Sequence, residues 1–186
     1  MIASLAAAPS YASSTTEDFA SLASEMGVVV GVDEEIVDAG FDEAGGSYLV
    51  VADRSAAEPE LVALGEQVQH TTGEGTTITT GVSASCTQSI KTDPPYKLNN
   101  KVHGKITYKK SADCGKRTVC QDLGEKIGIW FPKGECTTLG ASIVSGTLYM
   151  ASTTCNSGTS TTWGNSGVWG SETLPVFVTK SLACRT

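Results

Sequence analysis

The sequence predicts a small α+β N-terminal pro-region followed by an all-β, disulfide-stabilised C-terminal domain, folded as a sandwich or a partly open barrel. Three observations support this prediction: the charge changes sign near residue 82, all six cysteines follow that point, and strand patterns predominate after it. We therefore expect a signal-peptide remnant (1–13), an acidic pro-region (14–70), a linker (71–85) and a basic domain (86–186).

The first segment is expected to be the end of a secretory signal. Residues 1–13 combine a short apolar run with Pro9 and small residues around Tyr11 and Ala12, as in the region before a signal cleavage site. The run lacks the basic residues that usually open a signal. A disordered N-terminus is therefore the alternative interpretation.

The acidic pro-region is expected to be folded. A cap at Thr15 and a break at Gly27 predict a helix between them. Strands are predicted over residues 28–32, 48–52 and 76–80, and a second helix over 56–69. Residues 71–85 have the Thr, Gly and Ser content of a linker, with a processing site near Gly81/Val82.

The basic domain is predicted to contain short strands. They are expected over residues 101–110, 126–131, 142–150, 159–169 and 174–182. In the first of them, the apolar residues from Val102 to Tyr108 alternate with polar ones from Lys101 to Lys109. This alternation is typical of a strand with one buried face.

All six cysteines lie in the basic domain, at Cys86, Cys114, Cys120, Cys136, Cys155 and Cys184. Their even number and the absence of closely paired CxxC motifs favour three disulfides over a zinc site. Each bridge would stabilise the domain by about 2–4 kcal/mol, and such frameworks belong to oxidising, extracellular compartments. The sequence does not choose among the pairings, although the short gap between Cys114 and Cys120 permits a small closed ring.

The two halves of the chain carry opposite charge. Residues 1–81 contain 14 acids and one base, which gives −13, and residues 82–186 contain 6 acids and 12 bases, which gives +6. Their sum is the net charge of −7. An acidic pro-region of this kind would mask a cationic product electrostatically.

Basic residues recur along the first predicted strand and the turn after it, at Lys101, Lys105, Lys109, Lys110, Lys116 and Arg117. Such a stripe is suited to anionic lipid, cell-wall polymer or nucleic acid. The alternative is a solvated strand face whose lysines protect an edge from aggregation.

Two Trp-Gly pairs, at Trp163 and Trp169, flank an Asn-Ser-Gly sequence. A hairpin turn there would bring both indoles together as a platform for sugar rings or lipid headgroups. The alternative is that these residues, and above all Trp130, belong to the core.

Catalysis has little support in the sequence. The basic domain has one histidine, His103, and its acids are scattered, so neither a nucleophile–histidine pair nor a histidine-rich metal site is predicted. We therefore expect no enzyme activity, metal or cofactor. A small hydrolase blocked by the pro-region is a third, less favoured hypothesis.

These observations favour a secreted, cationic, antimicrobial or toxin-like protein. It would bind an anionic cell surface or cell-wall polymer after release from the acidic pro-region. In the other arrangement, the cleaved pro-region stays bound to the basic domain through their opposite charges. The alternative is a serine-protease inhibitor that presents Lys116 and Arg117 to a target protease on a Cys114–Cys120 loop. No transmembrane segment is predicted.

Overall fold

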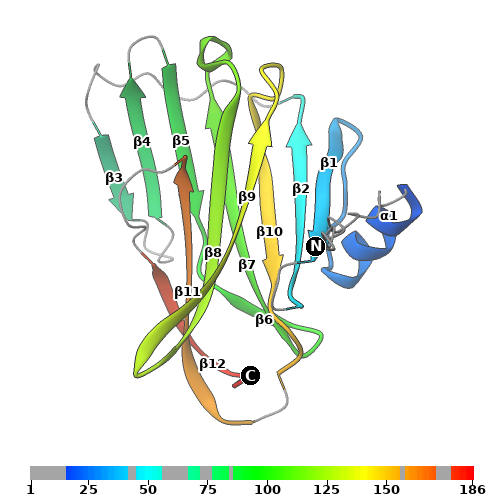
Figure 1. Ribbon diagram of the computed structural model, residues 1–186, viewed down its shortest axis with the longest axis vertical. Coiled ribbons are helices and arrows are strands. Elements are labelled where there is room, and N and C mark those ends of the chain that lie inside the picture. The colour runs from blue at the N-terminus through cyan, green and yellow to red at the C-terminus, as the bar shows by residue number, and fades with distance from the viewer. Residues whose placement is uncertain are drawn as a thin grey trace, which may run out of the picture.

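The computed structural model describes residues 16–41, 45–55, 67–71, 77–83, 86–155, 158–170 and 177–186. These residues form two antiparallel sheets that face one another as a sandwich (Figure 1). The elements are α1 (Thr16–Glu25), β1 (Glu34–Phe41), β2 (Ser47–Asp53), β3 (Gln67–Thr71), β4 (Thr77–Ser83), β5 (Cys86–Thr92), β6 (Tyr96–Leu98), β7 (Lys101–Lys110), the 3-10 helix η1 (Ala112–Cys114), β8 (Arg117–Ile127), β9 (Ile129–Leu139), β10 (Ser145–Ala151), β11 (Ser160–Trp169) and β12 (Val178–Ala183).

Strands from both halves of the chain build the larger sheet. Its order is β1-β2-β10-β7-β5-β4-β3, with β6 paired to β7, and the smaller sheet has the order β12-β11-β8-β9. The acidic half therefore supplies β1 and β2 at one edge and β3 and β4 at the other, around strands of the basic half (Figure 1). Val51 of β2 pairs with Thr147 of β10, and Gly81 of β4 pairs with Gln88 of β5.

The main core lies between the two sheets. Alternate residues of β7 point inward, which buries Ile106 and Tyr108 completely. They pack with residues from β2, β5, β8, β9, β10 and β11, namely Val50, Ile90, Val119, Leu139, Leu148 and Trp169. The strand pattern predicted for residues 101–110 is thus confirmed.

A second apolar cluster fixes α1 on the outer face of the larger sheet. Leu22 and Met26 of the helix region pack against Leu49 and Val51 of β2 and Ala151 of β10. Gly27, with φ +67°, ends the helix and turns the chain. The following apolar segment was predicted as a strand over 28–32, but it is a loop whose Val28 and Val30 pack under the helix.

The two sheets are also joined by polar contacts at one edge. Asp38 of β1 accepts hydrogen bonds from the Thr137 hydroxyl of β9 at 2.8 Å and from the Tyr48 hydroxyl at 3.4 Å. Burial, followed by the charges of Asp38 and Glu135, raises the pKa of Tyr48 to about 12. This contact links the edge strands of both sheets.

Three disulfides are present, as the cysteine count predicted. They join Cys86 to Cys114, Cys120 to Cys136 and Cys155 to Cys184. The small ring that the spacing of Cys114 and Cys120 permitted is therefore not formed. β8 places Cys120 directly opposite Cys136 of β9, while Cys114 in η1 lies beside β5.

Some other elements differ from their predictions because strand pairing between distant residues outweighs the local sequence pattern. Residues 126–131 contain a hairpin turn at Gly128 rather than one strand, and the last residues of the helix predicted over 56–69 belong to β3. Residues 56–66 lie outside the described part, as do 1–15. The predicted linker contains β4, and its processing remains a prediction.

Candidate functional site

The six predicted basic residues occupy three different environments. β7 places Lys101, Lys105 and Lys109 on the outer face of the larger sheet, because odd-numbered residues of this strand point away from the core. Lys110 points inward at the end of the same strand. Lys116 and Arg117 are exposed at the start of β8.

Two of the outer lysines are paired with acids. The Lys105 ammonium lies 3.1 Å from the carboxylate of Asp93, which also lies 3.4 Å from Lys91. Lys101 forms an ion pair with Glu25 at the end of α1. These pairs are partly exposed, and they lower the positive field at Lys101 and Lys105.

Lys110 is a buried structural residue. Its ammonium donates hydrogen bonds to the carbonyl oxygens of Gly115 at 2.8 Å and Ala141 at 3.1 Å. Burial, and secondarily the charge of Arg117, lowers the pKa of Lys110. Lys110 therefore joins the turn before β8 to the turn after β9 rather than presenting its charge to solvent.

The remaining cations, Lys109, Lys116 and Arg117, form what we call the basic end. They lie within nine residues of one another, and no ion pair involves them among the described residues. The turn between them is held by the Cys86–Cys114 disulfide and by two hydrogen bonds between Thr87 and Ser111, of 2.8 and 3.1 Å. A rigid backbone thus carries cations whose charge is unpaired in this part of the structure.

Trp163 and Trp169 lie in the core. They are only 3% and 6% exposed, and β11 runs without a turn through Asn165, so the predicted hairpin is wrong. The Trp163 indole N–H donates a hydrogen bond to the Cys184 carbonyl oxygen at 2.8 Å. The Trp169 and Tyr108 rings pack in a T-shaped arrangement. The side chain of Trp130 lies outside the described part.

The inhibitor hypothesis loses its structural premise, because Cys114 and Cys120 bond to different partners. Lys116 and Arg117 instead connect η1 to β8, and Arg117 already pairs with Leu139 of β9. The backbone of Arg117 is therefore part of a sheet, and protease inhibition stays a prediction without the disulfide-closed loop that it assumed.

His103 is buried although it lies on the outer face of β7. Its ring stacks on Tyr96 at 5.3 Å between centroids, and Nε2 donates to the Leu98 carbonyl oxygen at 3.1 Å. Burial lowers the pKa of His103 below its ordinary value of 6.5. Among the described residues, no group of three or more His, Cys, Asp or Glu side chains is placed to hold a metal ion.

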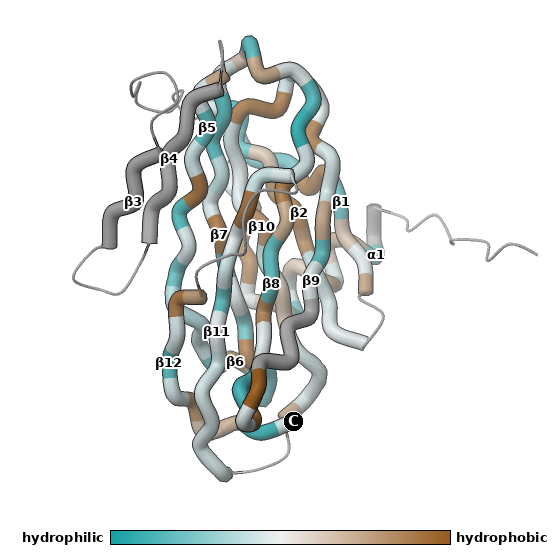
Figure 2. The backbone as a smooth tube through the Cα atoms, turned by 60° about the vertical axis from the view of Figure 1, so that its left-hand side comes forward, coloured by the Kyte–Doolittle hydropathy of each residue, from teal (hydrophilic) through white to brown (hydrophobic). Residues whose placement is uncertain are grey.

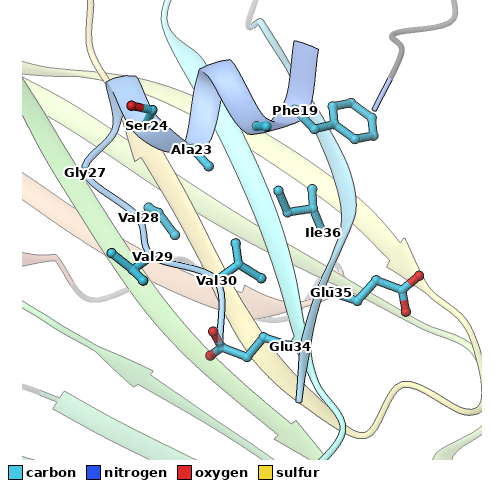
Figure 3. Close-up of a pocket in the computed structure, with 11 residues that line it drawn as sticks. Phe19, Ala23, Ser24, Gly27, Val28, Val29, Val30, Glu34, Glu35 and Ile36 are labelled. Atoms are coloured by element: carbon cyan, nitrogen blue, oxygen red, sulfur yellow. The ribbon is translucent and has the colours of Figure 1, made fainter. Parts of the chain in front are cut away.

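One groove was not predicted from the sequence. It has a volume of about 800 Å³ and lies between α1, the loop after it and β1, with apolar walls that include Phe19, Val28 and Ile36 (Figure 3). Glu34 and Glu35 lie at one end, where Glu34 accepts a hydrogen bond from the Gly31 amide and Glu35 pairs with Arg54. Helix packing creates this groove, so no local pattern indicates it.

Within the described residues, no helix has the length and apolar character needed to cross a bilayer. No known protein family, curated protein or solved structure matches the chain.

Proposed function

We propose that this chain is a secreted, disulfide-bonded binding protein, antimicrobial or toxin-like, that uses its basic end to bind an anionic cell surface. The observation that carries the proposal is the group formed by Lys109, Lys116 and Arg117, without ion pairs among the described residues and on a turn tied by a disulfide. The other predicted basic residues support this group indirectly, since Lys110 anchors its turn.

The chemistry of the three side chains suits phosphate or carboxylate groups. Arg117 offers a planar fork that binds such anions in a bidentate manner, and each lysine offers a compact positive charge. Because the turn is already ordered, binding costs little conformational entropy. Each cation near an anionic bilayer contributes about 1 kcal/mol, so loss of all three should weaken binding about a hundredfold.

The acidic segment is proposed to remain associated with the basic domain after any processing. Its Glu25 neutralises Lys101, but no ion pair joins it to the basic end in the described part. The segment therefore need not leave for the basic end to act. Opposite charge on the two halves, −13 and +6, would also hold them together after a cut.

The test is cosedimentation of the full, oxidised chain with anionic phosphatidylglycerol vesicles and with isolated bacterial cell walls, at low and at physiological salt. The triple variant Lys109→Gln, Lys116→Gln, Arg117→Gln is compared with the charge-matched control Lys91→Gln, Lys97→Gln, Lys180→Gln. We expect salt-sensitive binding that falls about a hundredfold in the first variant and less than about fivefold in the control.

Three outcomes would overturn the proposal. Binding that is insensitive to salt would exclude an electrostatic site. Equal losses in both triple variants would indicate a response to overall charge rather than to the basic end. Trypsin inhibition by the intact protein, lost in Arg117→Ala, would favour the protease inhibitor instead.

A further inference from the structure

The groove between α1, the loop after it and β1 has apolar walls and an acidic end. The walls are apolar side chains from all three elements, among them Ala20, Ala23, Val28, Val30 and Ile36. Figure 3 shows Val30 and Ile36 in the space between the loop and β1, with Glu34 farther from α1 than either. A ligand along this groove would therefore meet apolar surface first and a carboxylate at its end.

The groove leaves apolar surface in contact with solvent. Val28, Val30 and Ile36 are only partly buried, and Val29 and Val32 of the same loop are 90% and 102% exposed. Contiguous exposed apolar surface commonly marks a binding site. The volume of about 800 Å³ falls within the range of about 300–1,000 Å³ that is usual for pockets holding one small ligand.

Glu34 keeps its negative charge available at the end of the groove. Its carboxylate accepts a hydrogen bond from the Gly31 amide at 2.7 Å, and no ion pair reaches it among the described residues. The neighbouring Glu35 is instead paired with Arg54, which is the only base of the acidic half. A ligand with a positive charge would therefore complement Glu34.

We propose that this groove binds a single-chain amphiphile with a cationic head, such as a long-chain primary amine. The alkyl chain would lie along the apolar walls, and the ammonium group would donate hydrogen bonds to the Glu34 carboxylate. The head of a fatty acid would be repelled by Glu34, and an uncharged head would gain no ion pair there.

The size of the groove favours an alkyl chain over a helical peptide. An α-helix with its side chains is about 10–12 Å across, so about 800 Å³ would hold roughly two turns of it. A single alkyl chain is narrow enough to contact α1, the loop and β1 at the same time. Most of its apolar surface would then be removed from water.

The groove is a different surface from the basic end, and the inference does not rest on the proposed function. Lys109 lies on β7, and β2 and β10 separate this strand from β1 (Figure 2). Three strand spacings put about 14 Å between β7 and β1. Loss of either site should therefore leave the other one intact.

The test is isothermal titration calorimetry of the full, oxidised chain with decylammonium chloride and with sodium decanoate, both below their critical micelle concentrations. The two probes have the same number of carbon atoms and heads of opposite charge. We expect decylammonium to bind at least tenfold more tightly than decanoate. Across hexyl-, octyl- and decylammonium, affinity should increase about fourfold for each methylene that enters the groove.

The role of the acidic end is tested with Glu34→Gln, which removes the charge but keeps an oxygen for the Gly31 amide. This variant should bind decylammonium about tenfold more weakly and should not bind decanoate more weakly. Asp113→Asn is the charge-matched control, because it removes one negative charge from exposed η1. It should bind both probes like the wild type.

The apolar walls are tested with Ala20→Phe, which places a ring in the groove from an exposed position of α1. It should weaken decylammonium binding at least tenfold. Ser21→Phe is the control, because Ser21 is also exposed on α1 but does not line the groove. Near-UV circular dichroism confirms that each variant is folded.

The basic-end triple variant separates this inference from the proposed function. Its affinity for decylammonium should equal that of the wild type, and any decanoate that binds to the basic end should be lost in it. Failure of vesicle binding would therefore leave the decylammonium result unchanged.

Three results would overturn the inference. Equal affinities for decylammonium and decanoate in the triple variant would show that Glu34 does not select the head. Decylammonium binding that survives both Glu34→Gln and Ala20→Phe would place the probe elsewhere. No binding by the wild type, with self-association that Ala20→Phe abolishes, would make a second copy of the chain the occupant.

Discussion

The Asn165 side-chain amide donates a hydrogen bond to the Lys105 carbonyl oxygen at 2.9 Å, across the interior of the sandwich. The same amide donates to the Asp93 carbonyl oxygen at 2.9 Å, and its oxygen accepts from Gln121 at 2.7 Å. Asn165 thus ties β11 and β8 of the smaller sheet to β7 of the larger one. Buried amide networks of this kind specify how two sheets align, because leaving any member unpaired is costly.

This contact requires a glycine at position 104. A Cβ there would lie 2.5 Å from the Asn165 side-chain oxygen, so Gly104→Ala should displace the amide and lower the free energy of unfolding by about 1–3 kcal/mol. Gly140→Ala is the matched control, because no atom lies within 4 Å of its Cβ position. Urea denaturation measures the free energy of unfolding of both variants. Equal values for the two would contradict the prediction, because the close approach of Asn165 to Gly104 would then not limit packing.

Acid should weaken the fold through His103. Burial lowers its pKa below 6.5, so the unfolded chain takes up a proton near pH 6.5 while the folded chain remains neutral. The unfolded state then binds more protons, and stability should fall as the pH drops below 6.5. The charge of Lys101 lowers the pKa of His103 and that of Glu25 raises it, so these two effects oppose one another.

The measurement is the free energy of unfolding of the wild type and of His103→Gln at pH 7.5 and pH 5. We expect the wild type to lose more stability than the variant over this interval. A larger or equal loss in the variant would contradict the prediction, since carboxylates common to both proteins would then account for the pH response.

The Cys155–Cys184 disulfide should contribute more stability than the exposed Cys120–Cys136 disulfide. Cys155 and Cys184 belong to an apolar cluster with Leu123 and Trp163, whereas Cys136 is exposed on the outer face of the smaller sheet. Cys120→Ala, Cys136→Ala should cost about 3 kcal/mol, mainly through loop entropy. Cys155→Ala, Cys184→Ala should cost at least about 1 kcal/mol more, because it also leaves a cavity.

Thermal unfolding and mass-resolved reduction check this order. The Cys120–Cys136 bond should be reduced first by dithiothreitol under native conditions, since solvent reaches Cys136. Simultaneous loss of all three bonds would indicate that reduction requires global unfolding.

A cut just after β4, close to the processing site predicted near Gly81/Val82, should not release the acidic segment. Cleavage between residues 84 and 85 breaks neither the pairing of β2 with β10 nor that of β4 with β5. The N-terminal fragment would therefore stay hydrogen-bonded to the C-terminal fragment at both edges of the larger sheet. Its removal would expose two new sheet edges and the apolar surface under α1. A protease site inserted at 84–85 tests this arrangement.

After cleavage, we expect both fragments to elute together in size-exclusion chromatography at micromolar concentration and to separate in urea. Val51→Asp, which places a charge in the cluster under α1, should weaken the association. Separation of the wild-type fragments in native buffer would instead support a pro-region that leaves.

The sequence by itself determined the features that depend on local periodicity and composition. Alternation marked β7 at residues 101–110, Gly27 marked the end of α1, and the even cysteine count indicated three disulfides. These features need only the geometry of a single strand or helix, or the chemistry of one residue type.

The tertiary structure alone decided which segments became neighbours. It paired Cys114 with Cys86 and placed β2 beside β10. It also buried Lys110 against two carbonyl oxygens, and it buried the side chains of Trp163, Asn165 and Trp169 along β11. The Asn-Ser-Gly sequence that favours a turn locally became strand because Asn165 gains hydrogen bonds from both sheets. Contacts between residues far apart in the chain set those energies, and local periodicity carries no information about them.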